Sequence, residues 1–220
     1  MKEEDMVIIY ATNISKLQDP KEVPHLLASL PQARQEKILR CRVADKRKQS
    51  LGAGLLLEYV LNLHGKSSME IKIGENGKPQ LENFFFNLSH AGDYVICAVG
   101  EELVGCDVEK ITQEPKNLAE KYFCKSEKEH LNQLEGIERT KEFFRIWTLK
   151  ESYMKMTGEG MRLALNRVEF IVGDRVKVYR DGVLCSCGIK EYEIVGYKCS
   201  VCSEDIAFSQ ELRWVDLLSE

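Results

Sequence analysis

The sequence has no long apolar run, which excludes a membrane-spanning helix. Its apolar stretches, such as 55–57 and 84–86, cover only a few residues, whereas a membrane span requires roughly 18. The first five residues also lack the basic start and the apolar segment of a signal peptide. We therefore expect a cytoplasmic protein without a membrane partner, whose eight cysteines are thiols.

The chain also lacks an excess of positive charge and internal repeats. Its net charge of -4 argues against nucleic-acid binding, because affinity for the phosphate backbone depends on clustered Lys and Arg. Basic residues are nevertheless concentrated between residues 34 and 48, where seven Lys and Arg are accompanied only by Glu36 and Asp45. This basic segment is suited to a small phosphorylated ligand.

The hydrophobic pattern predicts two halves of similar organisation, each a long helix followed by extended segments. In the first half, the spacing of Leu51, Leu55, Tyr59 and Leu63 predicts a helix over 44–63. The other expected elements are strands at 71–73, 84–88 and 94–99, a capping box at 126–129, a helix over 138–157, and strands over 168–201 with a hairpin turn at Asp181-Gly182. We expect lobes of residues 1–102 and 103–220.

The segment 103–109 carries the first chemical pattern. In an extended strand, Val104, Cys106 and Val108 point to one face, while Asp107 and Glu109 point to the other. Neighbouring carboxylates raise each other's pKa unless a cation compensates, and their oxygens suit Mg2+. The alternative is a solvated strand face without a ligand.

Two further patterns are individually ambiguous. Glu151 and Lys155 lie one helical turn apart, which also describes an ordinary helix-stabilising ion pair. Ser89 and His90 end a predicted strand with their side chains on opposite faces, so they do not form a nucleophile and base, and no G-x-S-x-G motif is present. A turn with exposed N–H groups beside His90 is suited to a phosphate, and a plain solvent-facing turn is the alternative.

Two motif blocks occur about forty residues apart, and two minor ones precede them. The main blocks are Val104-Gly105-Cys106-Asp107-Val108-Glu109 and Trp147-Thr148-Leu149-Lys150-Glu151-Ser152 followed by Lys155. Gly77-Lys78-Pro79 and Asn87-x-Ser89-His90 come earlier in the chain. Together they resemble the signature of the surfactin-type 4'-phosphopantetheinyl transferases, in which Ile or Val stands at the position of Cys106.

The resemblance implies a monomer of two similar α+β lobes related by a pseudo-twofold axis, with coenzyme A in the cleft between them. It also implies that Asp107, Glu109 and Glu151 are Mg2+ ligands and that Lys155 contacts the coenzyme's phosphates. A serine hydroxyl of an acyl or peptidyl carrier protein would attack the β-phosphate and release adenosine 3',5'-bisphosphate. Glu151 is the expected base, directly or through a water at the metal, and Glu127 is a possible substitute.

The expected coenzyme A contacts come from several segments. The resemblance places Lys78, Ser89 and His90 around the 3'-phosphate, and Lys150 and Lys155 complete the motif-based set. In the basic segment, the candidates are Arg34, Lys37, Lys48 and Ser50. Carrier proteins are generally acidic near the modified serine, so the lysine-rich segment 117–132 is a candidate surface for transient docking. Its alternative is an amphipathic segment that packs its aromatic residues inward.

Three competing interpretations remain at the level of sequence. Cys185-x-Cys187 and Cys199-x-x-Cys202 superficially resemble a zinc site, but Cys199 and Cys202 fall on opposite faces of an ideal strand, so we expect packed thiols. A Mg2+-dependent nucleotide phosphohydrolase would use the same three carboxylates. A coenzyme A-binding protein without transferase activity is the third interpretation.

Overall fold

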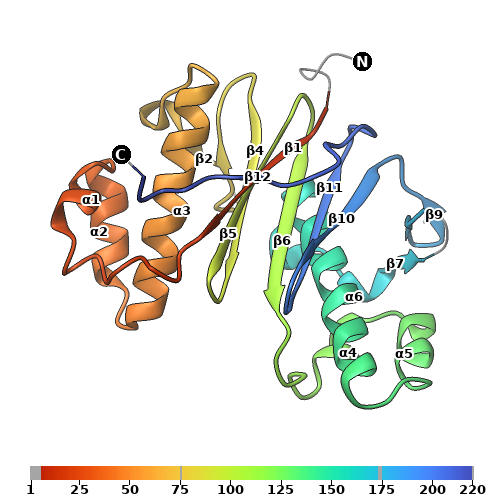
Figure 1. Ribbon diagram of the computed structural model, residues 1–220. Coiled ribbons are helices and arrows are strands. Elements are labelled where there is room, and N and C mark those ends of the chain that lie inside the picture. Colours follow the sequence, from red (N-terminus) through yellow and green to blue (C-terminus); the bar gives the residue numbers. More distant parts are fainter. Residues whose placement is uncertain (1–5, 75, 173–174, 220) are drawn as a thin grey trace.

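The computed structural model describes residues 6–74, 76–172 and 175–219 (Figure 1). The helices are α1 (Pro24–Ala28), α2 (Gln32–Arg40), α3 (Ala44–Leu63), α4 (Leu118–Tyr122), α5 (Lys125–Leu131) and α6 (Gly136–Thr157). Short 3-10 helices occupy Ser68–Glu70, Gly160–Arg162 and Leu165–Arg167. The sequence also predicts a turn at 75–79, of which residue 75 lies outside the described residues.

The strands form two main sheets and two small ones. The first sheet has the order β12-β1-β5-β4, and the second has the order β10-β11-β6. Two small sheets contain β2-β3 and β7-β8-β9. The strand bounds are β1 (Ile8–Asn13), β2 (Lys72–Ile73), β3 (Pro79–Gln80), β4 (Phe85–Ala91), β5 (Tyr94–Gly100), β6 (Val104–Lys110), β7 (Val168–Ile171), β8 (Lys177–Arg180), β9 (Val183–Leu184), β10 (Gly188–Ile194), β11 (Tyr197–Ser203) and β12 (Arg213–Trp214).

The two main sheets face each other and are covered on their outer sides by α3 and α6 (Figure 1). Strand alternation explains this arrangement, because Ile8 and Tyr10 of β1 pack in the α3 core while Val7 and Ile9 pack between the sheets. On β6, Val104, Cys106 and Val108 enter that same shared core. The predicted α+β class, with two lobes each built from a sheet and a long helix, is confirmed.

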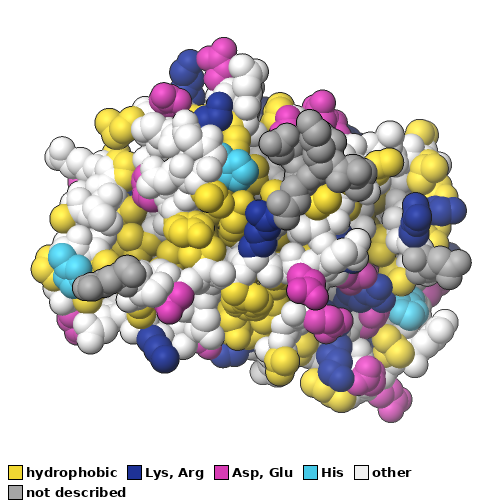
Figure 2. All heavy atoms as spheres, turned by 45° about the horizontal axis from the view of Figure 1, so that its top comes forward, with side chains coloured by type: hydrophobic (Ala, Val, Ile, Leu, Met, Phe, Trp, Pro, Cys, Tyr) yellow, Lys and Arg dark blue, Asp and Glu magenta, His cyan; other side chains and the backbone are white. Residues whose placement is uncertain are grey.

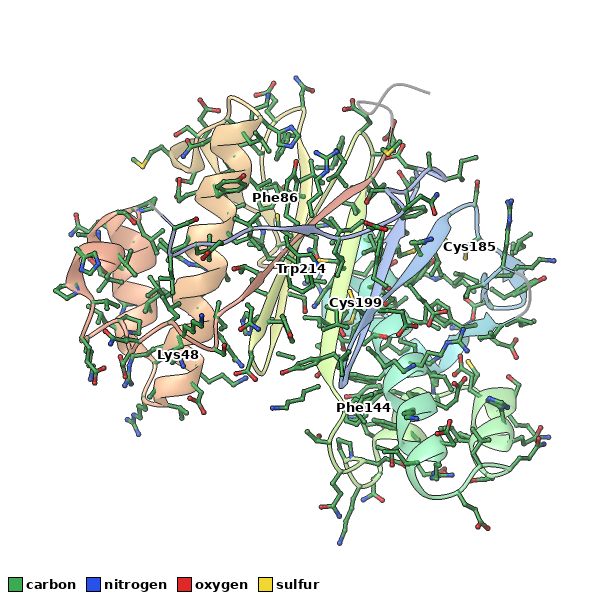
Figure 3. The ribbon with its side chains drawn as sticks, viewed as in Figure 1. Lys48, Phe86, Phe144, Cys185, Cys199 and Trp214 are labelled. Atoms are coloured by element: carbon green, nitrogen blue, oxygen red, sulfur yellow. The ribbon has the colours of Figure 1, made fainter. Side chains whose placement is uncertain are left out.

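Helix α3 has the predicted bounds, but its predicted stripe is only partly correct. Leu51 is fully buried, whereas Tyr59 and Leu63 are 46% and 57% exposed. A step of four residues exceeds one turn by about 40°, so three such steps rotate the stripe by about 120° out of the interface. The buried face continues through Leu56 and Val60, which pack in the same core as Phe86 of β4 (Figure 3).

Local turn chemistry was predicted with mixed success. The hairpin turn is confirmed, since Asp181 and Gly182 both have positive φ between β8 and β9. The predicted cap at Ser126 is wrong by two residues, because Cys124 is the N-cap of α5 and its N–H donates to Glu127 Oε2 at 2.8 Å. Cysteine is not among the usual cap residues, so the sequence favoured the serine.

The C-terminal segment returns to the first sheet. β12 pairs in parallel with β1, and the segment crosses both sheets before it ends near α3 (Figure 1). The boundary expected between residues 102 and 103 falls between β5 and β6, and the exact position of this boundary stays a prediction.

On the face in Figure 2, basic side chains lie among acidic ones. Within the described ranges, no helix combines the length and apolar character that crossing a bilayer would require.

Candidate active site

The site forms where the end of β4, the strand β6 and the last turns of α6 meet. Gly105 of β6 allows this contact, because a Cβ at that position would lie 2.2 Å from both Met156 N and Ser152 O of α6. The backbones of β6 and α6 therefore touch at Gly105, and a larger residue would push them apart. Two residues further along β6, on the same face of the strand, Asp107 reaches Lys155.

A buried network joins the two lobes at Asp107. Its Oδ1 accepts hydrogen bonds from Lys155 Nζ at 2.6 Å and from Ser89 Oγ at 2.9 Å. Lys155 Nζ also lies 3.0 Å from Ser89 Oγ, and this hydroxyl accepts the N–H of Val108 at 3.3 Å. Ser89 belongs to β4 in the first lobe, whereas Asp107 and Lys155 belong to the second. The structure thus brings these three predicted residues together at the junction of the lobes.

Burial raises the pKa values of the three carboxylates of this site. Burial, and then the charge of Asp107, raises the pKa of Glu109 to about 7 and that of Glu151 to about 7. Burial also raises the pKa of Asp107, although Lys155 opposes the shift. Because Asp107 contributes to both glutamate shifts, the three carboxylates share one electrostatic environment.

The donor set fits a hard divalent cation in type and charge. Asp107 Oδ2 is buried and accepts no hydrogen bond from the described residues. Such an unpaired buried carboxylate oxygen is costly unless a cation or a donor satisfies it. Among the described residues, no three His, Cys, Asp or Glu side chains are gathered closely enough to form a complete metal site by themselves. Any such cation would therefore need oxygen ligands from outside this cluster or a small movement of the glutamates.

Positive charge surrounds His90 at the edge of the site. Burial, followed by the charges of Lys46, Lys155 and Arg34, lowers the pKa of His90 to about 4. The side chain is nevertheless exposed, so an anion can approach it. Arg34 donates from Nη2 to Ser50 O at 3.2 Å, and its buried Nε has no hydrogen-bond partner in the described part of the chain. We refer to Lys46, Arg34 and His90 as the cationic group, and this group is suited to a phosphate.

Lys78 does not have the predicted phosphate contact. Its Nζ donates to the carbonyls of Lys155, Met156 and Val104 at 2.6, 3.1 and 3.2 Å. An ammonium group has three protons, and all three are used by these backbone acceptors. The prediction for Lys78 is therefore corrected: it binds the end of α6.

Lys150 does not have the predicted contact with coenzyme A either. Its side chain is fully buried, with Nζ 2.8 Å from Glu127 Oε2 and hydrogen-bonded to the carbonyls of Leu165 and Val168. Glu127 Oε1 in turn accepts the N–H of Phe170. The ion pair thus lies in the core of the second lobe, which contradicts a coenzyme contact for Lys150 and leaves Glu127 engaged in structure.

The remaining candidates from the basic segment lie in different surroundings. Lys37 is exposed on the last turn of α2. Lys48, on α3 (Figure 3), lines a small cavity of 160 Å³ together with Gly92 and Lys110. Ser50 contributes its backbone carbonyl to Arg34. Their roles as coenzyme contacts stay predictions.

Sequence reasoning missed two residues of this site. Trp147 Nε1 donates to Glu109 Oε1 at 3.2 Å, which orients that carboxylate. Lys46 contributes to the positive charge around His90. The helical period contained a signal for Lys46, since Lys46 and Ser50 lie four residues apart on one face of α3, whereas Lys48 points elsewhere.

The aromatic residues of the candidate docking segment 117–132 pack mostly inward. Phe123 is 1% exposed and stacks on Phe143, while Tyr122 packs against Trp147.

Cys199 and Cys202 enter different cores, as their positions on opposite strand faces predicted. All eight cysteines are free thiols.

Comparisons with known proteins identify the family of this chain. A model of the 4'-phosphopantetheinyl transferase superfamily matches residues 103–202, and a model of the N-terminal part of 4'-phosphopantetheinyl transferases matches residues 18–102. The transferase gsp of Aneurinibacillus migulanus is 31% identical, with 81% of this chain and 78% of that protein covered. The transferase Sfp of Bacillus subtilis is 28% identical, with 94% and 96% covered.

The chain belongs to the 4'-phosphopantetheinyl transferase family. It is of the Sfp type within that family, and it is a transferase.

Proposed function

We propose that this enzyme transfers 4'-phosphopantetheine from coenzyme A to a serine of an apo acyl or peptidyl carrier protein, with Mg2+, and releases adenosine 3',5'-bisphosphate. The observation that carries the proposal is the buried Ser89–Asp107–Lys155 network at the junction of the lobes, beside two glutamates of raised pKa. The proposed enzyme is cytoplasmic and acts as a monomer.

Each residue of the site has a distinct task in this proposal. The cationic group of Lys46, Arg34 and His90 binds the coenzyme's 3'-phosphate, which would favour protonation of the imidazole. Lys155 neutralises charge on the pyrophosphate and exchanges part of its contact with Asp107 for the ligand. Ser89 holds Asp107 in place through its hydroxyl group.

The residues that would hold Mg2+ are Asp107, Glu109 and Glu151. When bound, Mg2+ supplies positive charge to the phosphate oxygens and stabilises the leaving oxygen. Trp147 keeps Glu109 oriented through its indole N–H. The unpaired Asp107 Oδ2 and the raised glutamate pKa values support this ligand set.

Glu151 is the proposed base that accepts the serine proton. In the site without a cation, burial and the charge of Asp107 raise the pKa of Glu151 to about 7, and Mg2+ on this carboxylate would lower it. The proposal for Glu151 therefore rests on its place beside Asp107 and not on this pKa. Glu127, the alternative, has both carboxylate oxygens occupied by Lys150 and backbone N–H groups. These contacts favour Glu151 over Glu127.

Mass spectrometry of an apo carrier protein incubated with the enzyme, coenzyme A and Mg2+ tests the function. Added mass of one phosphopantetheine, dependent on enzyme and on Mg2+, is the expected result. Cleaved coenzyme without carrier modification would instead support a phosphohydrolase. Binding of coenzyme A without either product would support a binding protein, and both of these outcomes contradict the proposal.

The carrier protein is proposed to dock transiently on the lysines of segment 117–132. Lys121 and Lys125 are exposed, while the neighbouring Phe123 is buried, so charge rather than an aromatic anchor would supply this contact. The double substitution Lys121→Glu with Lys125→Glu should raise KM for the carrier several-fold at low salt and leave KM for coenzyme A unchanged. An unchanged carrier KM at low salt would exclude this surface.

A further inference from the structure

The hairpin β2–β3 of the first lobe binds the C-terminal end of α6. Lys78 Nζ donates to Lys155 O and Met156 O, in the last turn of α6, and to Val104 O at the start of β6. Asn76 Nδ2 donates to Gly158 O at 2.8 Å, just beyond the helix. Two side chains from one short loop thus satisfy three carbonyls at or after the end of the helix.

These contacts have a clear physical role. The last four carbonyls of an α-helix lack partners within the helix, and a cation near them also interacts favourably with the helix dipole. Met154 O is already bonded by Gly158 N–H and Thr157 Oγ1, so Lys78 supplies the donor for the next two carbonyls. Burial lowers the pKa of the Lys78 ammonium, which is consistent with an internal structural contact.

The same turn of α6 carries Lys155. While the Lys155 carbonyl is held by Lys78, the Lys155 ammonium contacts Asp107 and Ser89. On the other side of this turn, the backbone of α6 rests on Gly105. The last turn is therefore held between β6 and the hairpin, and loss of the hairpin contact would free it on one side.

We propose that Lys78 is a positioning residue, which fixes Lys155 through the end of α6 and does not itself touch the phosphates of coenzyme A. The inference rests on the proposed function, because it assigns Lys155 to the coenzyme's pyrophosphate. It also gives the first lobe a task in transfer besides binding the 3'-phosphate, namely holding the last turn of the second lobe's helix.

A double-mutant cycle tests the inference. Lys78→Met should lower kcat/KM for carrier modification by about 10- to 100-fold, the loss expected for a displaced catalytic group. In the Lys155→Met background, Lys78→Met should change the remaining rate by less than about twofold, because Lys78 acts through Lys155. Lys72→Met, exposed on the same hairpin, is the matched control and should leave kcat/KM unchanged.

A binding measurement separates positioning from direct contact. Lys78→Met should leave the calorimetric affinity for adenosine 3',5'-bisphosphate, relative to adenosine 5'-monophosphate, within about twofold of the unmodified enzyme. A selective loss of affinity for the bisphosphate, or losses that multiply with those of Lys155→Met, would overturn the inference. If Lys78→Met does not fold, Asn76→Ala replaces it in the same cycle, with a smaller loss in the same direction.

Hydrogen exchange tests the role of Lys78 independently of the proposed function. Amides of residues 152–158 should exchange faster in Lys78→Met than in Lys72→Met, whether or not transfer is observed. If the unmodified enzyme transfers nothing, the proposed function fails while exchange still tests the contact. If it transfers, but the exchange rates are equal or the cycle is additive, the positioning role alone fails.

Discussion

Helices α3 and α6 cover their sheets in similar ways, but the two interfaces differ in chemistry. Between α3 and its sheet, apolar side chains such as Leu51, Val60 and Val95 form the core. Between α6 and its sheet, Asp107 meets Lys155, and the hydroxyls of Ser200 and Ser152 lie 3.2 Å apart. Apolar burial stabilises the first interface at roughly 25 cal/mol per Å².

The second interface has buried polar groups, which cost free energy unless they are paired. The difference teaches that one layer arrangement can serve two purposes. The first lobe uses its helix–sheet contact mainly for stability, whereas the second lobe uses its contact to hold charges in a fixed geometry. Substitutions at equivalent places in the two interfaces should therefore have different consequences.

The largest expected effect is the loss of activity in Asp107→Asn. This change keeps the shape of the side chain but removes the charge that Lys155 contacts, so transfer should fall by about 100-fold or more. Asp45→Asn, exposed on the first turn of α3, is the control and should retain its rate. Initial rates of carrier modification measure both, and a rate for Asp107→Asn within a few-fold of the original enzyme would refute the role of this charge.

The next effect concerns the ion pair inside the second lobe. Glu127→Gln leaves the fully buried Lys150 without its counter-charge, which typically costs about 3–5 kcal/mol of unfolding free energy. Glu129→Gln, which breaks the exposed pair with Lys125, should cost about 1 kcal/mol or less. Denaturant unfolding measures the difference. Transfer per folded molecule should persist in Glu127→Gln, and its abolition would identify Glu127 as the base.

Alanine substitutions at Gly105 and Gly52 test the two helix–sheet contacts directly. A Cβ at Gly105 would meet backbone atoms of α6 at 2.2 Å, whereas a Cβ at Gly52 of α3 would meet the side chain of Ile14 at 2.6 Å. A side chain can rotate away and a helix backbone cannot, so Gly105→Ala should lose about 1–3 kcal/mol and most of the activity. Gly52→Ala should lose less stability and keep activity. Equal losses of stability and of rate would contradict the proposed difference.

The smallest effect is a pH dependence of stability in Glu151→Gln. The folded-state pKa of Glu151 is about 7, above its ordinary value of 4.5. Below pH 4.5 both states hold the proton, and as pH rises towards 7 the unfolded state releases it first, which destabilises the fold. Without divalent cations, Glu151→Gln should thus match the original Tm near pH 4 and exceed it by a few degrees at pH 8. A Tm difference that does not change with pH would show that folding does not raise the pKa of Glu151.

Much of the fold followed from local pattern. The predicted helix over 44–63 has the bounds of α3, alternation placed Asp107 opposite the shared core, and Asp-Gly predicted the hairpin turn. These features depend on residues close in the chain, because helical period, strand alternation and turn conformation are local properties.

The partners of individual charges depended on tertiary structure. The motif blocks that contain Lys78 and Lys150 indicated the family, but they did not indicate that Lys78 binds three carbonyls or that Lys150 pairs with Glu127. A lysine side chain is long and flexible, so its partner is whichever acceptor the packed elements bring within reach. The sequence alone determined which residue types and elements this protein has. Only the folded arrangement decided which of its lysines face the site and which hold the structure, because those acceptors come from segments far apart in the chain.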